Sequence, residues 1–358
     1  MAFFIWIPFA LVALVYSIFR SFMFLAYPRA ETNPRANLQS LERRLTLWFR
    51  VWVFAAVVET IASGGLPIIW LIQGSSKIYF DYGIPSLHGL VNSLLFSIAL
   101  CSFALFLATG KRNHLGIPVF ALLWSILILN RNMMLVCLLE AAIVFVCLRG
   151  VRILTLFKLG VGLLLFILGF GYLGDFRSGS AQTFRLLAEP ASWYPEWLPS
   201  GILWAYIYIT TPINNLVNTM HSGHPVYSLL FPNTVANLFP SVIRDLVYGG
   251  RASDALSGQI VSEIFNASSA YIGPLQDFGL LGVVLYSIIV AFACQYFWFR
   301  TGLKNILVFA VLTQCLILSL FYNHFFYLPV ITQLLWFSIF FARDIQMRKI
   351  VMSQTHAI

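Results

Sequence analysis

Five arginines are the residues of this sequence best suited to binding an anion. They are Arg131, Arg177, Arg185, Arg244 and Arg251. Arginine is always charged and presents a planar fork of N–H donors that matches the oxygens of phosphates and carboxylates. Each of them alone is equally well explained as an interfacial arginine that contacts lipid headgroups, but the group of five favours an anion site. A lipid phosphate or pyrophosphate is the natural anion at a membrane surface.

Histidines and buried acids are the candidates for moving a proton. His88 and His324 lie at the ends of predicted spans, on the same side as the arginines. A histidine near a carboxylate can act as a general base because its ordinary pKa is about 6.5, although a lone surface histidine usually has no such role. Glu59 and Glu140 fall inside predicted spans, where acids are functional candidates. Small residues follow Glu59 up to Pro67, as in helix ends that line cavities, whereas Glu140 is better explained by a hydrogen bond to a neighbouring helix.

Several common site types are absent from the sequence. It contains no phosphate-binding loop, no paired-cysteine motif and no acid-x-acid pair suited to a divalent ion. We therefore expect neither a metal nor a cofactor. The five cysteines all fall in apolar segments, which predicts no disulfide framework.

The elements that must position these residues are membrane helices. Hydrophobic residues make up 60% of the 358 residues and charged ones only 10%, against about 25% charged in soluble proteins. Each span needs about 20 apolar residues. The sequence predicts an all-α, polytopic integral membrane protein with nine transmembrane helices, at 3–26, 47–72, 85–108, 115–129, 132–148, 155–174, 271–299, 303–321 and 327–342.

The positive charges predict the orientation of these spans. If the N-terminus is outside and the C-terminus inside, six of the 22 basic residues lie on the outer side, namely Lys77 and the five arginines, and the others occupy inner loops. This agrees with the excess of basic residues found in cytoplasmic loops. The same distribution explains the net charge of +9 without a nucleic-acid partner.

The chain is predicted to have three parts. Residues 1–174 form an N-terminal bundle, 175–270 a large outer loop, and 271–358 a C-terminal bundle with a basic tail. The best apolar run of the loop, 202–213, is too short for a span and meets Pro212. We expect it to lie at the interface as an amphipathic or re-entrant helix.

Residues 115–149 are predicted to form a hairpin rather than one helix. A single helix over this range would be about 50 Å long, more than a bilayer needs, and would place the later basic loops outside. The turn is expected at Asn130-Arg131-Asn132. An arginine sunken toward mid-membrane costs on the order of 3 kcal/mol.

Four stretches resemble the O-antigen polymerase (Wzy) family. Glu59 to Pro67 is similar to an acid followed by Gly-Gly-x-Pro, and Ser86 to Leu90 to a His-Gly helix start. Asn130-Arg131-Asn132 resembles the family's arginine at the start of a span. Ala270 to Gly279, with Gly282, resembles its Tyr-x-Gly-Pro and acidic-Phe-Gly entry to a late span.

The resemblance implies a GT-C-like membrane glycosyltransferase of the bacterial inner membrane, with its active site facing the periplasm. Such an enzyme passes a growing glycan from undecaprenyl pyrophosphate to the terminal sugar of a lipid-linked repeat unit. Besides this lipid-linked oligosaccharide and membrane lipid, a chain-length regulator protein is an expected partner.

The resemblance also assigns roles to the candidate residues. The pyrophosphate is expected to be held by Arg131, Arg177, Arg244 and Arg251. Leaving pyrophosphate develops negative charge, which arginines can stabilise without a metal ion. The acceptor hydroxyl is expected to be assisted by His324, His88 or Glu59. The glycan is expected to contact Trp193, Tyr194, Trp197 and Asp277, although interfacial anchoring explains the aromatic residues equally well.

Two alternative functions stay open. An O-antigen ligase would share the fold and the donor but would transfer the glycan to a lipid A core. A flippase or transporter for a lipid-linked glycan would have no catalytic role. The absence of an internal repeat and the one-sided loop argue against a transporter.

Overall fold

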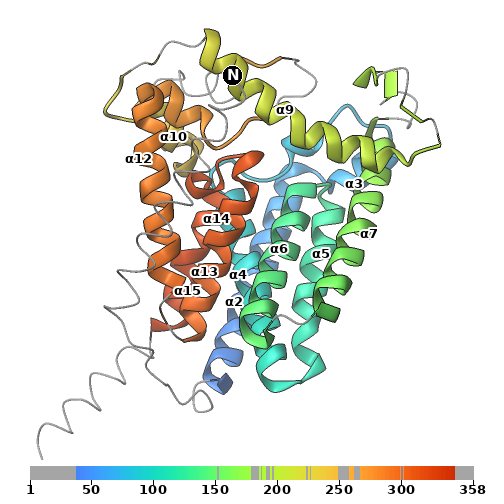
Figure 1. Cartoon of the computed structure of the whole chain (residues 1–358). Coiled ribbons are helices and arrows are strands. Elements are labelled where there is room, and N and C mark those ends of the chain that lie inside the picture. Colours follow the sequence, from blue (N-terminus) through green and yellow to red (C-terminus); the bar gives the residue numbers. More distant parts are fainter. Residues whose placement is uncertain are drawn as a thin grey trace, which may run out of the picture.

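The computed structural model describes residues 38–150, 153–178, 185–186, 188–190, 194–195, 197–222, 225, 227–248, 258–261, 267–298, 300 and 302–342. These residues form helices joined by loops (Figure 1). The longer helices are α2 (Leu38–Ser63), α4 (Leu87–Thr109), α5 (Gly116–Leu127), α6 (Arg131–Arg149), α7 (Ile153–Ser178), α9 (Ser200–Ser222), α12 (Ile272–Trp298) and α13 (Leu303–Ile317). The shorter α-helices are α3 (Pro67–Ile72), α10 (Pro232–Val235), α11 (Ser241–Tyr248), α14 (Leu328–Ile331) and α15 (Gln333–Phe340), and short 3-10 turns include η4 (Ala236–Leu238) and η6 (His324–Phe326).

Five helical segments of the described chain are long and apolar enough to cross a membrane. They are Leu38–Ile72, Leu87–Thr109, Arg131–Arg149, Ile272–Trp298 and Leu303–Leu320. These helices indicate a membrane-embedded protein, compatible with a polytopic one. Of the other predicted spans, 3–26 lies outside the described residues, while 115–129, 155–174 and 327–342 correspond to α5, α7 and the pair α14–α15. Nine crossings therefore remain a prediction.

Helix α4 lies at the centre of the bundle. Most of its residues are buried, and it packs against α2, α5, α6, α14 and α15. Helix α13 in turn packs against α6 and α12. The predicted N-terminal and C-terminal groups of helices therefore share one hydrophobic core, which contains residues such as Leu95, Val136, Val311 and Phe337.

Local sequence explains two breaks that shape the site. Helix α2 ends where Gly64 and Gly65 adopt positive φ angles of 76° and 136°, and Pro67 begins α3. Such angles favour glycine, which has no Cβ. The predicted hairpin is confirmed, because α5 ends at Leu127 and Asn130 caps α6 by accepting a hydrogen bond from the Met133 N–H at 3.1 Å.

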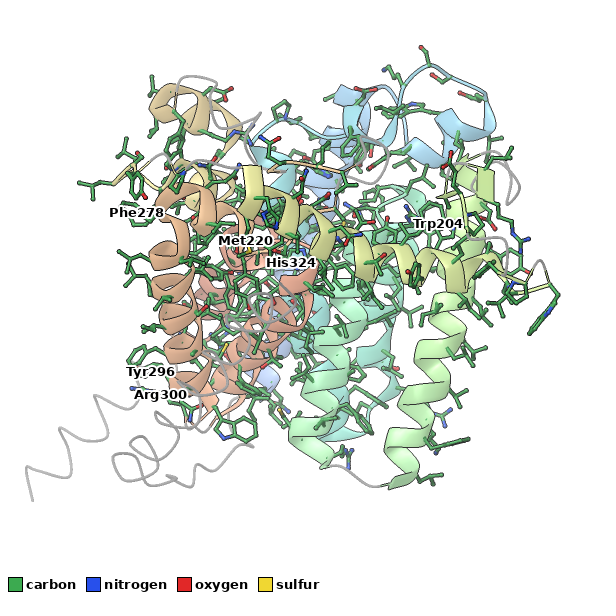
Figure 2. The ribbon with its side chains drawn as sticks, turned by 45° about the horizontal axis from the view of Figure 1, so that its top comes forward. Trp204, Met220, Phe278, Tyr296, Arg300 and His324 are labelled. Carbon is green, nitrogen blue, oxygen red and sulfur yellow. The ribbon has the colours of Figure 1, made fainter. Side chains whose placement is uncertain are left out.

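The bundle has two distinct ends. We call the end that carries residues 64–86, the start of α6, helix α9 and the turn 321–327 the loop end, and the opposite end the basic end. At the basic end Arg149 donates to the Leu107 carbonyl at 2.7 Å, and Arg44 donates to the Phe340 carbonyl. Each arginine thus satisfies a carbonyl near the C-terminus of another helix. Figure 2 shows Arg300 at one end of the molecule and His324 toward the other.

Helix α9 crosses the loop end from α7 to α12, as Figure 1 shows. At its first turn the backbones of α7 and α9 touch, so that a Cβ on Gly171 would lie 2.3 Å from the Gly201 Cα. The apolar run 202–213, expected to form an amphipathic or re-entrant helix, lies within α9, which continues through Pro212 to Ser222. The part of α9 after Pro212 is held by Asn215 and Thr219, which bond to the segments 258–261 and 267–270.

Candidate functional site

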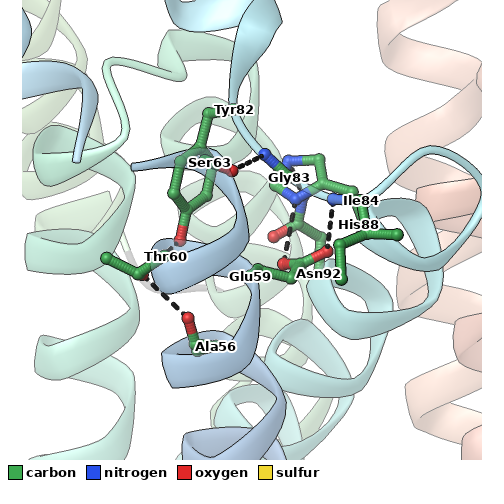
Figure 3. A network of polar contacts seen from close by, with 9 residues as sticks. All are labelled: Ala56, Glu59, Thr60, Ser63, Tyr82, Gly83, Ile84, His88 and Asn92. Atoms are coloured by element: carbon green, nitrogen blue, oxygen red, sulfur yellow. Dashed lines mark hydrogen bonds and ion pairs between the residues drawn. The ribbon is translucent and has the colours of Figure 1, made fainter. Parts of the chain in front are cut away.

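A buried carboxylate and a half-exposed histidine form the first part of the site (Figure 3). Glu59 on α2 is 1% exposed, and its Oε2 lies 3.2 Å from Nδ1 of His88 at the start of α4. The His88 side chain is 26% exposed. The pair therefore combines an acid sheltered from water with a partly exposed imidazole.

The loop 79–86 encloses the Glu59–His88 pair. The Ile84 N–H donates to Glu59 Oε1 at 3.3 Å, and the Gly83 N–H donates to the Ser63 hydroxyl at 2.9 Å. Gly83 has a φ of 98°, and a Cβ there would lie 2.5 Å from the imidazole of His88. Glycine is required because the backbone both turns left-handed and passes close to the ring.

Tyr82 completes this enclosure. Its hydroxyl lies 2.9 Å from the Thr60 hydroxyl, and its ring meets the His88 ring edge-on at 5.4 Å. Burial raises the pKa of Tyr82, and the nearby Glu59 charge acts in the same direction while the Thr60 contact opposes it. Tyr82 therefore stays neutral, and its ring packs against the imidazole of His88.

The contacts of His88 assign its tautomer. The Nδ1–H donates to Glu59, and Nε2 lies 2.8 Å from the Asn92 side-chain nitrogen, one helical turn along α4. Because that amide nitrogen can only donate, Nε2 carries the lone pair. A hydroxyl that took the place of Asn92 would meet a proton acceptor held in position by Glu59.

Arg131 is the centre of the second part of the site. Its guanidinium donates to the Tyr208 hydroxyl at 3.2 Å and lies over the Trp204 ring at 5.2 Å. A Cβ on Gly174 would lie 3.0 Å from its Nη1, so α7 closes the other side. Asp175 fixes this arrangement because it accepts hydrogen bonds from the Trp204 indole at 3.1 Å and from Ser200.

His324 lies in the third part, the turn between α13 and α14. It is 1% exposed, and its two ring nitrogens lie 2.9 Å from the Gln314 amide and 3.4 Å from the Asn132 amide. Burial lowers the pKa of His324 to about 3. The expectation that His324 acts as the base is not supported, because its side chain is enclosed and out of reach of a substrate, whereas that of His88 is 26% exposed.

Arg244 approaches the same turn from α11. Arg244 lies on α11, which packs against η4, and its Nε is 3.8 Å from the carboxylate of Asp245. Burial raises the pKa of Tyr322, and the positive charge of Arg244 opposes this rise. The Asn237 amide donates to the Tyr322 hydroxyl at 2.6 Å. The Tyr322 ring in turn meets the His324 ring at 5.7 Å.

Packing contacts join the three parts. The rings of Tyr208 and Phe321 are 6.4 Å apart, which connects the Arg131 region to the turn. Gly89, next to His88, approaches Leu328 so closely that a Cβ would lie 3.2 Å from it. Arg131, Arg244, His324 and the Glu59–His88 pair therefore belong to one end of the bundle.

Other predicted site residues have different outcomes. Arg251 and Trp193 lie outside the described residues, and Arg177 belongs to α7 without a described side chain. Trp197 is 80% exposed and free to contact a ligand, whereas Tyr194 packs against the cluster of Leu203, Trp204 and Ile207. Arg185 donates to the Leu198 carbonyl at 2.9 Å.

The structure corrects the expected role of Asp277. It was expected to contact the glycan, but it is fully buried and accepts from the Asn233 backbone and side chain at 3.0 and 2.8 Å. It also accepts from the Thr234 backbone and hydroxyl at 2.8 and 2.6 Å. Four donors saturate this carboxylate, so Asp277 fixes α10 against α12.

Glu140 has the structural role that was favoured for it. It is buried in α6 and accepts a hydrogen bond from the Gln333 amide of α15 at 2.8 Å. Among the described residues, no three His, Cys, Asp or Glu side chains gather as a metal site would require.

Sequence reasoning missed the residues that orient the candidates. Asn92, Tyr208 and Tyr322 each contact a predicted site residue or its neighbour. The spacing of His88 and Asn92, four residues apart on one helix face, was a signal that could have been used. Tyr208 and Tyr322 come from distant segments and left no local signal.

Comparison of the chain with protein-family models, curated proteins and solved structures found no match.

Proposed function

We propose that this protein is a membrane glycosyltransferase that polymerises lipid-linked oligosaccharide repeat units. The donor is a growing glycan on undecaprenyl pyrophosphate, and the acceptor is the terminal sugar of an incoming lipid-linked unit. The observation that carries the proposal is the His88 imidazole, half-exposed and held by buried Glu59, at the same end of the bundle as Arg131 and Arg244. A base and fixed positive charges at one end of the bundle suit transfer from a phosphate leaving group.

The proposed reaction forms one glycosidic bond, breaks one bond to pyrophosphate and moves one proton. The acceptor hydroxyl displaces Asn92 at His88 Nε2, gives its proton to that nitrogen, and attacks the anomeric carbon of the donor. The bond between this carbon and the pyrophosphate oxygen breaks, and the pyrophosphate leaves with the electron pair. Glu59 stabilises the imidazolium that results, because a buried carboxylate interacts strongly with an adjacent positive charge.

The arginines supply the complementary charge. Arg131 is held over Trp204 and against Tyr208 before substrate arrives, so it needs little reorganisation to meet developing negative charge. Arg244 is a second contact for the same group. In this proposal arginine takes the place that a divalent cation has in many pyrophosphate-dependent enzymes.

The orientation follows from the charges at the two ends. Arg44, Lys111, Arg112, Arg149 and Arg300 belong to the basic end. The positive-inside rule supports the proposal that the basic end faces the cytoplasm and the loop end faces the periplasm of a bacterial inner membrane. The acceptor and the donor would meet at this periplasmic surface.

The test is a gel assay of the purified full chain with its lipid-linked repeat unit, with and without EDTA. A ladder of lengthening glycan, unchanged by chelation, is the expected result. An unchanged substrate band, from protein that is folded and binds the substrate, would overturn the proposal. Transfer to a lipid A core with no ladder would make the enzyme a ligase instead.

A further inference from the structure

An apolar surface runs along one side of α12 and continues onto the loop that precedes α10. Leu281, Leu285 and Ile289 are exposed along one side of α12, four residues apart, as expected of a side that faces lipid. The helix is kinked at Phe278 and Gly279, where the φ of Gly279 is 62°. Figure 2 shows Phe278 on the outer side of this helix.

The loop 227–231 extends this surface from the kink. The Phe278 ring meets the Phe231 ring at 4.9 Å and the Tyr227 ring edge-on at 6.2 Å. Leu229 and Leu230 in the same loop are both exposed. The Leu230 carbonyl accepts a hydrogen bond from the Tyr248 hydroxyl at 3.1 Å, which fastens the end of α11 to the loop.

Helix α11 ends the surface with two faces of different character. Its apolar side chains point outward, with Val242 70% and Leu246 85% exposed. Arg244 lies between them in sequence, on a different side of the helix, with its Nε 3.8 Å from the carboxylate of Asp245. Helix α11 packs on η4, whose Asn237 donates to the Tyr322 hydroxyl in the turn beside His324. Helix α11 thus carries exposed apolar side chains on one face and Arg244, a residue of the candidate site, on another.

We propose that this surface, formed by Leu281, Phe278, the loop 227–231 and the outer face of α11, binds the polyprenyl tail of the lipid-linked donor. The tail would lie along α12 and α11 while its first phosphate meets Arg244. This inference rests on the proposed function, because it names where the lipid part of that substrate lies. The continuity with the lipid-facing side of α12 favours a hydrocarbon chain as the occupant.

The functional test compares donors with a long and a short prenyl tail on the full chain in nanodiscs. Leu246→Asp and Val242→Asp should each raise KM for the long-tailed donor about tenfold, the equivalent of about 1.4 kcal/mol of binding, with kcat unchanged. The short-tailed donor should be used as by the wild type. Ile72→Asp is the matched control, since Ile72 on α3 is also an exposed apolar residue of the loop end, across the bundle from α12.

A second measurement does not depend on catalysis. A long-chain polyprenyl phosphate with a photoreactive group in its tail should crosslink to residues 227–231, 242–247 or 278–285. Crosslinks confined to other helices, or equal losses with both tail lengths, would overturn the inference. A wild type that makes no ladder but crosslinks at this surface would overturn the proposed function and leave the tail site standing.

Discussion

At the scale of the residue, Glu59 should matter for the rate rather than for binding. It is buried behind His88, and in the proposed reaction its charge stabilises the imidazolium. Glu59→Gln keeps the size of the side chain but removes the charge. We expect kcat to fall about 100-fold, within the range of general acid–base effects, with KM unchanged, measured from initial rates of chain extension.

Glu42→Gln is the control for this substitution. Glu42 is an exposed acid near the other end of the same helix, α2, at the basic end of the bundle. Its replacement should leave kcat unaltered. A Glu59→Gln enzyme that works within twofold of the wild-type rate would remove the Glu59–His88 pair from the reaction.

Arg131 should not tolerate replacement by lysine. Lysine cannot reproduce a planar fork that donates to Tyr208 while it stacks on Trp204. Arg131→Lys should lose most activity, read as the disappearance of long polymer on a gel. Arg149→Lys, at the other end of α6, should retain activity, because lysine can still donate to the Leu107 carbonyl. Full polymer length from Arg131→Lys would exclude Arg131 from the site.

His324 predicts how stability changes with pH. Because burial lowers its folded-state pKa from 6.5 to about 3, the unfolded chain binds a proton that the folded chain does not bind between these values. Stability therefore falls as pH drops below 6.5, by about 1.4 kcal/mol per pH unit from this group, and the contribution is flat above 6.5. Melting temperatures in detergent should show a shallower decline between pH 6.5 and 4 for His324→Gln. A variant that declines as steeply as the wild type would contradict the burial of a neutral imidazole.

Sequence reasoning identified residue types better than their surroundings. Glu59, His88 and Arg131 could be selected because charged or titratable groups in apolar segments are costly and rare. Asp277 was selected through the family resemblance, yet its four donors include the backbone N–H groups of residues 233 and 234, about forty positions away. Whether a polar residue meets a ligand or another part of the chain depends on tertiary contacts that no local pattern contains.

At the scale of the element, the crossing of α7 and α9 sets the position of Trp204 and Tyr208. Gly171→Ala would put a methyl group 2.3 Å from the Gly201 Cα, which the backbones must move apart to accept. We expect a lower melting temperature and a loss of activity that parallels loss of the Arg131 contacts. Gly169→Ala, two residues earlier and with nothing within 4 Å of the added carbon, should be neutral or slightly stabilising.

If Gly171→Ala and Gly169→Ala melted at the same temperature, the close crossing would not be needed to hold α9.

The existence of most of these helices was evident from long apolar runs, and the α5–α6 hairpin from its Asn-Arg-Asn turn. The full length of α9 was not evident, because a proline normally ends or kinks a helix. Its second half is held by side-chain contacts to segments that come later in the chain.

At the scale of the whole molecule, the unequal ends predict an orientation that labelling can read. In a variant without its native cysteines, Ser76→Cys at the loop end should react with a membrane-impermeant thiol reagent in intact cells. Asn113→Cys at the basic end should react only after the membrane is opened. Both positions are exposed. The reverse pattern would place the proposed site on the cytoplasmic side and exclude a periplasmic reaction.

Composition alone could predict the class of the molecule, since 60% hydrophobic residues leave few options besides a membrane protein. It could not predict that helices from both halves share one core. The contact of α13 with α6 and that of α15 with α2 depend on side-chain shape, because in lipid the apolar character of a surface does not select its partner.

The arginines that terminate helices at the basic end have a consequence for how this protein can change. In the proposed orientation, Arg44 and Arg149 are part of the charge excess that directs membrane insertion. The same guanidinium groups bond to the ends of helices distant in sequence. The same two guanidinium groups therefore contribute both to the orientation signal and to the contacts between helices. A mutation of either arginine that alters the topology of this chain would therefore also weaken the packing of its helices.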